Sequence, residues 1–236
     1  MIPDAKTDRE YEAYAKTARN WDSAARRYVE HDTTAQETFG VLSPRTGDND
    51  NDRGPYVVAY TGRFYPFDPK PEDVRIADIA HGLAHSARYN GAGRRFYSTA
   101  EHSHHIAIWL LPRYGAQTAL TGLLHDAPEP LSGFGDVLRP VKDSAPIIKE
   151  TETNIWRRAL APAFDLPLDM PLAVHEADSR IIADEMRQNL AEVDPGYRDP
   201  LGVTLNFWSP EVADVWFLST FKILVEAVKA ENMRAA

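Results

Sequence analysis

The chain has 236 residues, of which 43% are hydrophobic, and this is enough apolar material to bury one sizeable core. Acidic residues outnumber basic residues by 35 to 26, and the formal net charge of -9 disfavours broad binding to nucleic-acid backbones. Because the chain contains no cysteine, disulfides, iron–sulfur clusters and thiolate zinc sites are excluded, and any metal ion must be held by His, carboxylate or water.

The N-terminal segment MIPDAKTDREYEAY lacks the basic start and apolar stretch of an export signal. No segment approaches the roughly 18 apolar residues of a membrane span. We therefore expect a cytoplasmic protein with no membrane partner and no nucleic-acid partner.

The first 55 residues form an N-terminal extension and a linker in this interpretation. An apolar stripe with spacings of three and four is typical of one helix face, and it comprises Tyr11, Tyr14, Ala18, Trp21, Ala25 and Tyr28. The next segment, Ser43 to Pro55, is rich in Gly, Asp and Asn and is expected to be a polar linker. The domains are therefore residues 1–55 and residues 56–236, and the stripe favours packing on the main domain or on a second subunit.

The main domain is predicted to be helical apart from one short β-hairpin. β-Branched and aromatic residues flank Thr61-Gly62, which predicts a hairpin within residues 56–67. Apolar spacing and breakers predict helices over residues 76–87, 98–111, 115–126, 146–160, 172–190 and 209–229. Pro71 and the acidic residues after it suit the first turn of the first of these helices, and Ser98 and Glu101 form a capping box. The fold class is therefore all-α.

Four side chains at or inside these helices provide a possible metal-ligand set. A divalent cation without thiolates needs about four His, Asp or Glu ligands that converge from different elements. His102 lies near the start of one helix, His125 and Asp126 lie at the end of the next, and Asp178 lies inside a later helix. A helical bundle can bring these three places together.

Other titratable residues offer alternatives to this set. His105 shares a helix face with the histidine three residues before it, and Glu176 and Asp184 lie on the same predicted helix as the candidate aspartate. His81 and His85 are one turn apart and suggest a second metal site, but no carboxylate partner is obvious, so packing near the site is the favoured interpretation.

Three phrases of the sequence resemble a known enzyme family when taken in order. DIAHGLAHSARYNGAGRRFYSTAEHS, LLHDAPEPLSGFGDVLRPVK and HEADSRIIADE are similar to the HD-domain metal-dependent phosphohydrolases, in particular to the 5'-deoxynucleotidase branch, which includes phage enzymes that hydrolyse dATP. The similarity covers residues 60–182, with a looser match in NFWSPEVADVWFLSTF. It implies an HD-type helical bundle with one divalent cation (Mn, Co, Zn, Mg, Fe or Ni), a nucleotide substrate, a homo-oligomer, and the host cytoplasm if the protein is phage-encoded.

The resemblance also assigns roles to individual residues of the metal site. It implies that His102, His125, Asp126 and Asp178 bind the ion. It makes Glu129, together with Asp126, the catalytic pair, with Glu129 orienting or deprotonating the attacking water. A carboxylate one turn from the ligands is chemically suited to that role.

The substrate-binding residues implied by the resemblance are Arg88, Tyr89, Asp136 and Lys142. Arg88 would meet phosphate, Asp136 and Lys142 would face the sugar and the phosphate, and Tyr89 stands where some relatives carry tryptophan. The expected activity is removal of phosphate from a dNMP or of triphosphate from a dNTP such as dATP. The alternative is a non-catalytic HD-like module that binds nucleotides or has a regulatory role.

Overall fold

The computed structural model describes residues 53–235, so the helix predicted at residues 11–28 and most of the linker lie outside the described part. Helices dominate this part, which confirms the all-α class. The strands are β1 (Val57–Val58) and β2 (Arg63–Phe64); the α-helices are α3 (Ile76–His85), α4 (Thr99–Leu124), α5 (Pro128–Ser132), α6 (Arg139–Ser144), α7 (Pro146–Ile155), α8 (Ala161–Phe164), α9 (Leu172–Asn189) and α10 (Pro210–Ala235); the other helical turns are η2 (Pro71–Asp73), η3 (Arg88–Gly91) and the π-helical η4 (Trp156–Leu160). Within residues 53–235, no helix combines the length and the apolar character needed to cross a bilayer.

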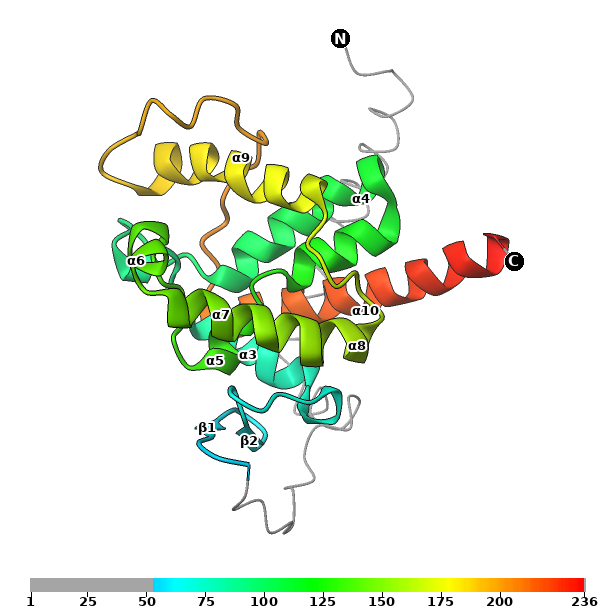
Figure 1. The fold of residues 1–236 in the computed structure, drawn as a ribbon. Coiled ribbons are helices and arrows are strands. Elements are labelled where there is room, and N and C mark those ends of the chain that lie inside the picture. Colours follow the sequence, from blue (N-terminus) through cyan, green and yellow to red (C-terminus); the bar gives the residue numbers. More distant parts are fainter. Residues whose placement is uncertain (1–52, 236) are drawn as a thin grey trace.

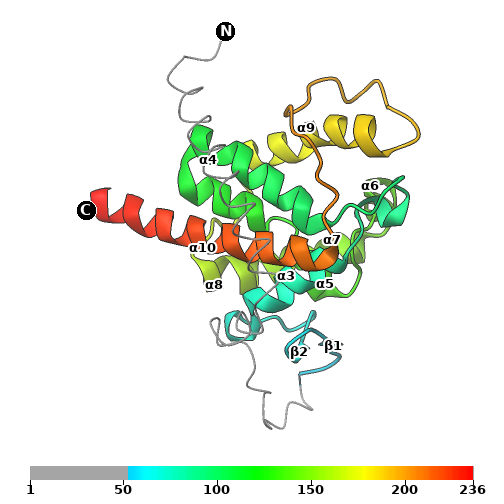
Figure 2. The same cartoon turned by 180° about the vertical axis from the view of Figure 1, so that it is seen from behind.

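The two longest helices, α4 and α10, pack against each other and form the centre of the molecule (Figure 1). Helix α9 packs against α4, while α3 packs against α10 and also contacts α5. Figure 2 shows α10 from the other side, with α9 and the β-hairpin at opposite ends of the molecule. The predicted hairpin is confirmed, with Val57 opposite Phe64 and Val58 opposite Arg63 in an antiparallel pair.

Helix α4 is a pair of helical segments joined at Gly115, which agrees with the prediction of two separate helices. Gly115 has φ 82° and ψ 174°, a conformation that favours glycine. The two segments then pack closely, because a Cβ added at Gly122 would lie 2.4 Å from Cδ1 of Leu110. This close approach places the start of the first segment near the end of the second, and the metal-site candidates lie at those two ends.

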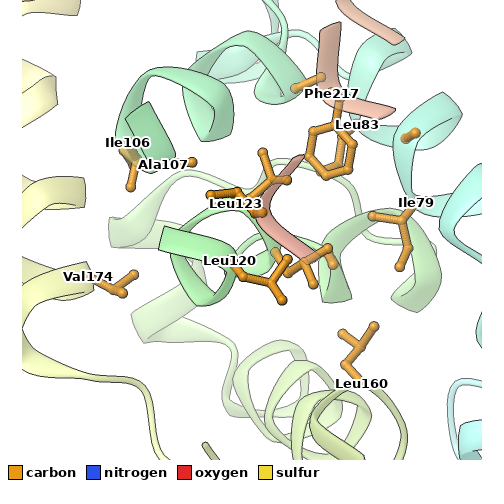
Figure 3. Packing of buried hydrophobic residues seen from close by; sticks show 14 of the residues in the cluster. Ile79, Leu83, Ile106, Ala107, Leu120, Leu123, Leu160, Val174 and Phe217 are labelled. Atoms are coloured by element: carbon orange, nitrogen blue, oxygen red, sulfur yellow. The ribbon is translucent and has the colours of Figure 1, made fainter. Parts of the chain in front are cut away.

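The core lies between α3, both segments of α4 and α10. Figure 3 shows Leu83, Leu123 and Phe217 among the labelled side chains of this cluster. All three are fully buried, and α9 contributes Val174 from its first turns. Because α4 and α9 are both held by this apolar packing, the polar side chains that they carry have a well-defined relative position.

Three local predictions were wrong or incomplete. Pro71 and the acidic residues after it form the separate turn η2, and α3 begins later, after Arg75. Only half of the predicted capping box forms: Ser98 Oγ accepts a hydrogen bond from the Glu101 backbone N–H at 3.1 Å. The Glu101 carboxylate instead accepts from the backbone N–H groups of residues 206, 207 and 208 at 2.6, 3.0 and 2.8 Å. The short helices α5 and α6 were not predicted.

Candidate metal centre

Two histidines and an aspartate meet where the two segments of α4 begin and end. Nε2 of His102 lies 3.6 Å from Oδ2 of Asp126, and Nε2 of His125 lies 3.2 Å from Oδ1 of the same carboxylate. One potential ligand atom from each of the three residues lies within 4.8 Å of the other two. This group can hold a metal ion, and it contains three of the four ligands that the sequence predicted.

Hydrogen bonds on the far side of each imidazole orient the two rings. Nδ1 of His125 lies 2.8 Å from the carbonyl oxygen of Gly122, one turn earlier in α4. Nδ1 of His102 lies 2.7 Å from Oε1 of Glu185 on α9. In a neutral ring, Nδ1 donates in each of these contacts, and the lone pair of Nε2 is then directed into the cluster.

The cluster contains buried polar atoms that form no hydrogen bond within the described residues. They are Nε2 of His102, Nε2 of His125, Oδ2 of Asp126 and Oε2 of Glu129. Buried polar atoms are nearly always hydrogen-bonded, so four such atoms in one place require an explanation. Two imidazoles and a carboxylate are a suitable donor set for a divalent first-row transition metal, and the residues therefore fit a bound cation.

Asp178 lies beside this group, on α9. Its Oδ1 is 3.3 Å from Nε2 of His102 and 3.7 Å from Nε2 of His125. Burial raises the pKa of Asp178, but its contacts with the two imidazoles outweigh burial and bring that pKa well below its usual range. The aspartate therefore favours the ionised form that can bind a cation, and its place as a fourth ligand stays a prediction.

Binding of a cation at this group would be coupled to the protonation of His102. Burial lowers the pKa of His102, as does Arg88, but the carboxylates of Glu185 and Asp178 outweigh both and raise the pKa to about 9. A metal ligand must be a neutral imidazole, so a cation that binds at Nε2 has to displace a proton from this ring at neutral pH.

The alternative ligands lie elsewhere. His105 contacts the Glu101 carboxylate at 3.4 Å and stacks on the ring of Trp208. Glu176 pairs with Arg180, and Asp184 accepts a hydrogen bond from the backbone of residue 202. The neighbouring rings of His81 and His85, tilted by 31° to each other, belong to no metal-binding group within residues 53–235. Geometry therefore favours His102 and Asp178 over their predicted substitutes.

The buried carboxylate of Glu129 and the half-buried ammonium of Lys142 form an ion pair next to the cluster. Lys142 Nζ lies 3.0 Å from Oε1 of Glu129 and 3.0 Å from Oε2 of Glu152 on α7. Burial and the Asp126 carboxylate raise the pKa of Glu129, while the Lys142 ammonium opposes that rise. Glu152 was not identified from the sequence, since its proximity depends on how α6 packs on α7 and no sequence motif links it to Lys142.

Arg88, Tyr89 and Asp136 form a second polar group that contacts the cluster. Nη1 of Arg88 lies 3.2 Å from Oδ1 of Asp136 and 3.7 Å from Oδ2 of Asp126. The backbone N–H of Tyr89 donates to Oδ2 of Asp136 at 2.7 Å. Tyr89 has φ 56° and ψ 31°, a left-handed conformation that is uncommon for a residue with a side chain and that clusters at functional sites. The structure thus brings Arg88 and Asp136 to the candidate centre, and their contact with a nucleotide stays a prediction.

A cavity of about 300 Å³ opens beside the cluster. It is lined by His125, Asp126, Pro128, Glu129, Lys142, Glu152, Thr153, Trp156, Arg157, Leu168, Asp169, Met170 and His175. Its wall includes the apolar side chains of Trp156 and Met170. The Lys and Arg side chains among the described residues that line it are both paired: Lys142 with Glu129 and Glu152, and Arg157 with Asp169. Among residues 53–235, no unpaired Lys or Arg side chain therefore lines the cavity.

Comparison with known proteins assigns no function to this centre. No family model matches the chain. The chain is 48% identical over 80 residues to an uncharacterized protein of Rhodobacter capsulatus, and this match covers 32% of the chain and 40% of that protein. The chain thus spans well under two thirds of this relative, and the HD-domain resemblance stays a prediction.

Proposed function

We propose that the protein is an HD-type, metal-dependent phosphohydrolase of deoxynucleotides. The observation that carries this proposal is the group of buried ligand atoms without hydrogen bonds on His102, His125 and Asp126, next to the equally unpartnered Oε2 of Glu129. A purely structural metal site needs no additional carboxyl group at its side. A hydrolytic site does need one, because water must lose a proton as it attacks.

The residues of the site have complementary roles in this proposal. A divalent cation bound by the cluster would supply a Lewis acid that polarises a phosphoryl oxygen and lowers the pKa of water. Glu129 orients the attacking water and accepts its proton while the water oxygen bonds to phosphorus. The bond between phosphorus and the ester oxygen then breaks, the ester oxygen takes up a proton from solvent, and Glu129 releases its own proton to solvent. Lys142 holds the Glu129 carboxylate, and Arg88 offsets negative charge on the phosphoryl group.

The distribution of charge favours a monophosphate over a triphosphate. Arg88 is surrounded by the carboxylates of Asp126, Asp136 and Glu185, at 3.7, 3.2 and 3.8 Å. The Lys and Arg side chains of the adjacent cavity are also paired with carboxylates. A triphosphate would need several unpaired cations, whereas the uncharged nucleoside of a monophosphate suits a cavity with apolar side chains such as Trp156 and Met170 in its wall.

A substrate panel tests this function. The purified chain would be incubated with Mn²⁺, Co²⁺, Mg²⁺ or Zn²⁺ and with mono- and triphosphates of the common ribo- and deoxynucleosides, and products would be separated chromatographically. We expect release of phosphate from deoxynucleoside monophosphates, lost when EDTA removes the metal. Nucleotide binding without turnover by metal-loaded protein would instead support the alternative, a non-catalytic HD-like nucleotide-binding or regulatory module.

A further inference from the structure

Glu185 is a buried carboxylate to which the proposed function assigns no role in the reaction. It lies on α9 seven residues after Asp178, and seven residues are close to two helical turns, so both side chains project from the same face of the helix. Its side chain is fully buried, at 0% exposure. An ionisable group in such a position carries a large desolvation penalty unless several partners compensate it.

The partners of Glu185 come from both halves of the candidate site. Oε1 lies 2.7 Å from Nδ1 of His102, the buried imidazole of the metal cluster. Oε2 accepts a hydrogen bond from the Tyr89 hydroxyl at 2.5 Å and lies 3.8 Å from Nη2 of Arg88. One carboxylate therefore contacts a metal-site histidine with one oxygen and the Arg88-Tyr89 segment with the other.

We propose that Glu185 is a positioning residue that fixes the tautomer and the ring orientation of His102 for a metal ion and links this ligand to the Arg88-Tyr89 segment. This inference rests on the proposed function for its purpose, but its geometry is independent of the substrate. The carboxylate has no proton to donate, so Nδ1 of His102 must carry the hydrogen that joins the two groups. With a neutral ring, Nε2 is then an acceptor directed toward Asp126 and Asp178, at 3.6 and 3.3 Å.

Removal of this contact would leave the His102 ring without its orienting partner. The ring could then adopt the other neutral tautomer, with hydrogen on Nε2. That tautomer cannot bind a cation through Nε2. Carboxylate partners of metal-bound histidines typically contribute about 10–100-fold to metal affinity. Glutamine at position 185 keeps the shape but has a single acceptor oxygen, which cannot accept from Nδ1 of His102 and from the Tyr89 hydroxyl at once. It also removes the negative charge that strengthens the imidazole as a ligand.

The experiment is a Mn²⁺ titration of the full chain, in which free Mn²⁺ is followed by electron paramagnetic resonance. Wild type is compared with Glu185→Gln and with Glu176→Gln, a matched control on an exposed position of the same helix. We expect Glu185→Gln to weaken Mn²⁺ binding by about 10–100-fold. The control should bind as wild type does, and the thermal unfolding midpoint of metal-free Glu185→Gln should stay close to that of metal-free wild type.

A folded Glu185→Gln variant with wild-type Mn²⁺ affinity would overturn the inference. If this variant does not fold, Glu185→Asp takes its place, because aspartate keeps the charge but is shorter by one methylene. Unchanged Mn²⁺ affinity in Glu185→Asp would also overturn the inference. Turnover of the wild type is measured on the same preparation. Mn²⁺ binding that depends on Glu185, without turnover of any nucleotide, would remove the proposed function and leave the positioning role intact.

Discussion

Replacement of Glu129 by glutamine tests the proposed base with little change in shape. The carboxyl group is buried, with Oε1 at 3.0 Å from Lys142 Nζ and with no hydrogen bond to Oε2. Glutamine retains an oxygen that can accept from Lys142, but its amide cannot take up a proton. We therefore expect Glu129→Gln to retain bound metal and to lose turnover.

The expected loss follows from the role of the carboxylate. A positioned general base contributes about 10²–10⁴-fold to a rate, which corresponds to roughly 3–5 kcal/mol of transition-state stabilisation. Burial and the Asp126 carboxylate raise the pKa of Glu129, and only the ionised form can accept a proton. The wild-type rate should therefore fall as the pH falls through this pKa. This fall is the acidic limb of the pH–rate profile, and the variant should lack it.

The assay is kcat and kcat/KM across pH on the best substrate of the panel, with bound metal measured by elemental analysis. Glu150→Gln is the matched control, because Glu150 is an exposed carboxylate on the neighbouring helix α7. The control should keep wild-type rates at every pH. A Glu129→Gln variant with wild-type kcat, or with the acidic limb still present, would refute the assignment of Glu129 as the base.

Further predictions concern the metal, the core and a distant carboxyl. Asp126→Ala should abolish bound metal by elemental analysis, and unchanged content would exclude Asp126 as a ligand. Leu123→Ala should lower the free energy of unfolding in urea by about 2–5 kcal/mol, because Leu123 is fully buried; a loss well below this would show that the core relaxes. Burial raises the pKa of Asp214 in the folded state to about 6, above its value in the unfolded state. The contribution of Asp214 to the free energy of unfolding is therefore present in acid and is lost as the pH rises through about 6. Asp214→Asn should therefore raise the Tm more at about pH 8 than at about pH 4, and equal gains would contradict this.

Much of the helical architecture was predictable because its signals are local. The apolar spacing of α9 and the breakers around it predicted residues 172–190, and the structure has Leu172–Asn189. The break at Gly115 likewise separated two predicted helices. The short helices α5 and α6 were missed because each contains proline and is too short to show an apolar period. Periodicity thus identified long helices and failed for single turns.

The capping box failed because a tertiary partner displaced a local one. A Glu101 side chain in a capping box would accept one hydrogen bond, from the Ser98 backbone N–H. In the structure it accepts three, from the consecutive amides of the loop before α10. Hydrogen bonds to a charged group contribute about 1.5–3 kcal/mol each, so three of them outweigh one. Sequence spacing cannot reveal this, because residues 206–208 are remote along the chain.

The candidate site shows the same division between local and long-range information. His102, His125 and Asp126 were predictable as a group because they lie at helix ends that a bundle can bring together, and the structure does so. Glu185 could also have been identified from the sequence, because its spacing from Asp178 places both on one face of α9. Glu152 could not have been identified from the sequence, because its link to the site passes through Lys142 and depends on tertiary packing.

The loop between α3 and α4 determines the position of the substrate-binding candidates relative to the candidate metal ligands. Its two ends are joined by hydrogen bonds from Arg88 N–H to the Tyr97 carbonyl at 2.9 Å and from Thr99 N–H to the Ser86 carbonyl at 3.0 Å. Arg88 at one end and His102, in the first turn of α4, are therefore held in a fixed relation, which Glu185 reinforces from α9 by contacting both. A phosphoryl group between Arg88 and the metal would then meet preorganised charge, so the site would need little rearrangement during the reaction.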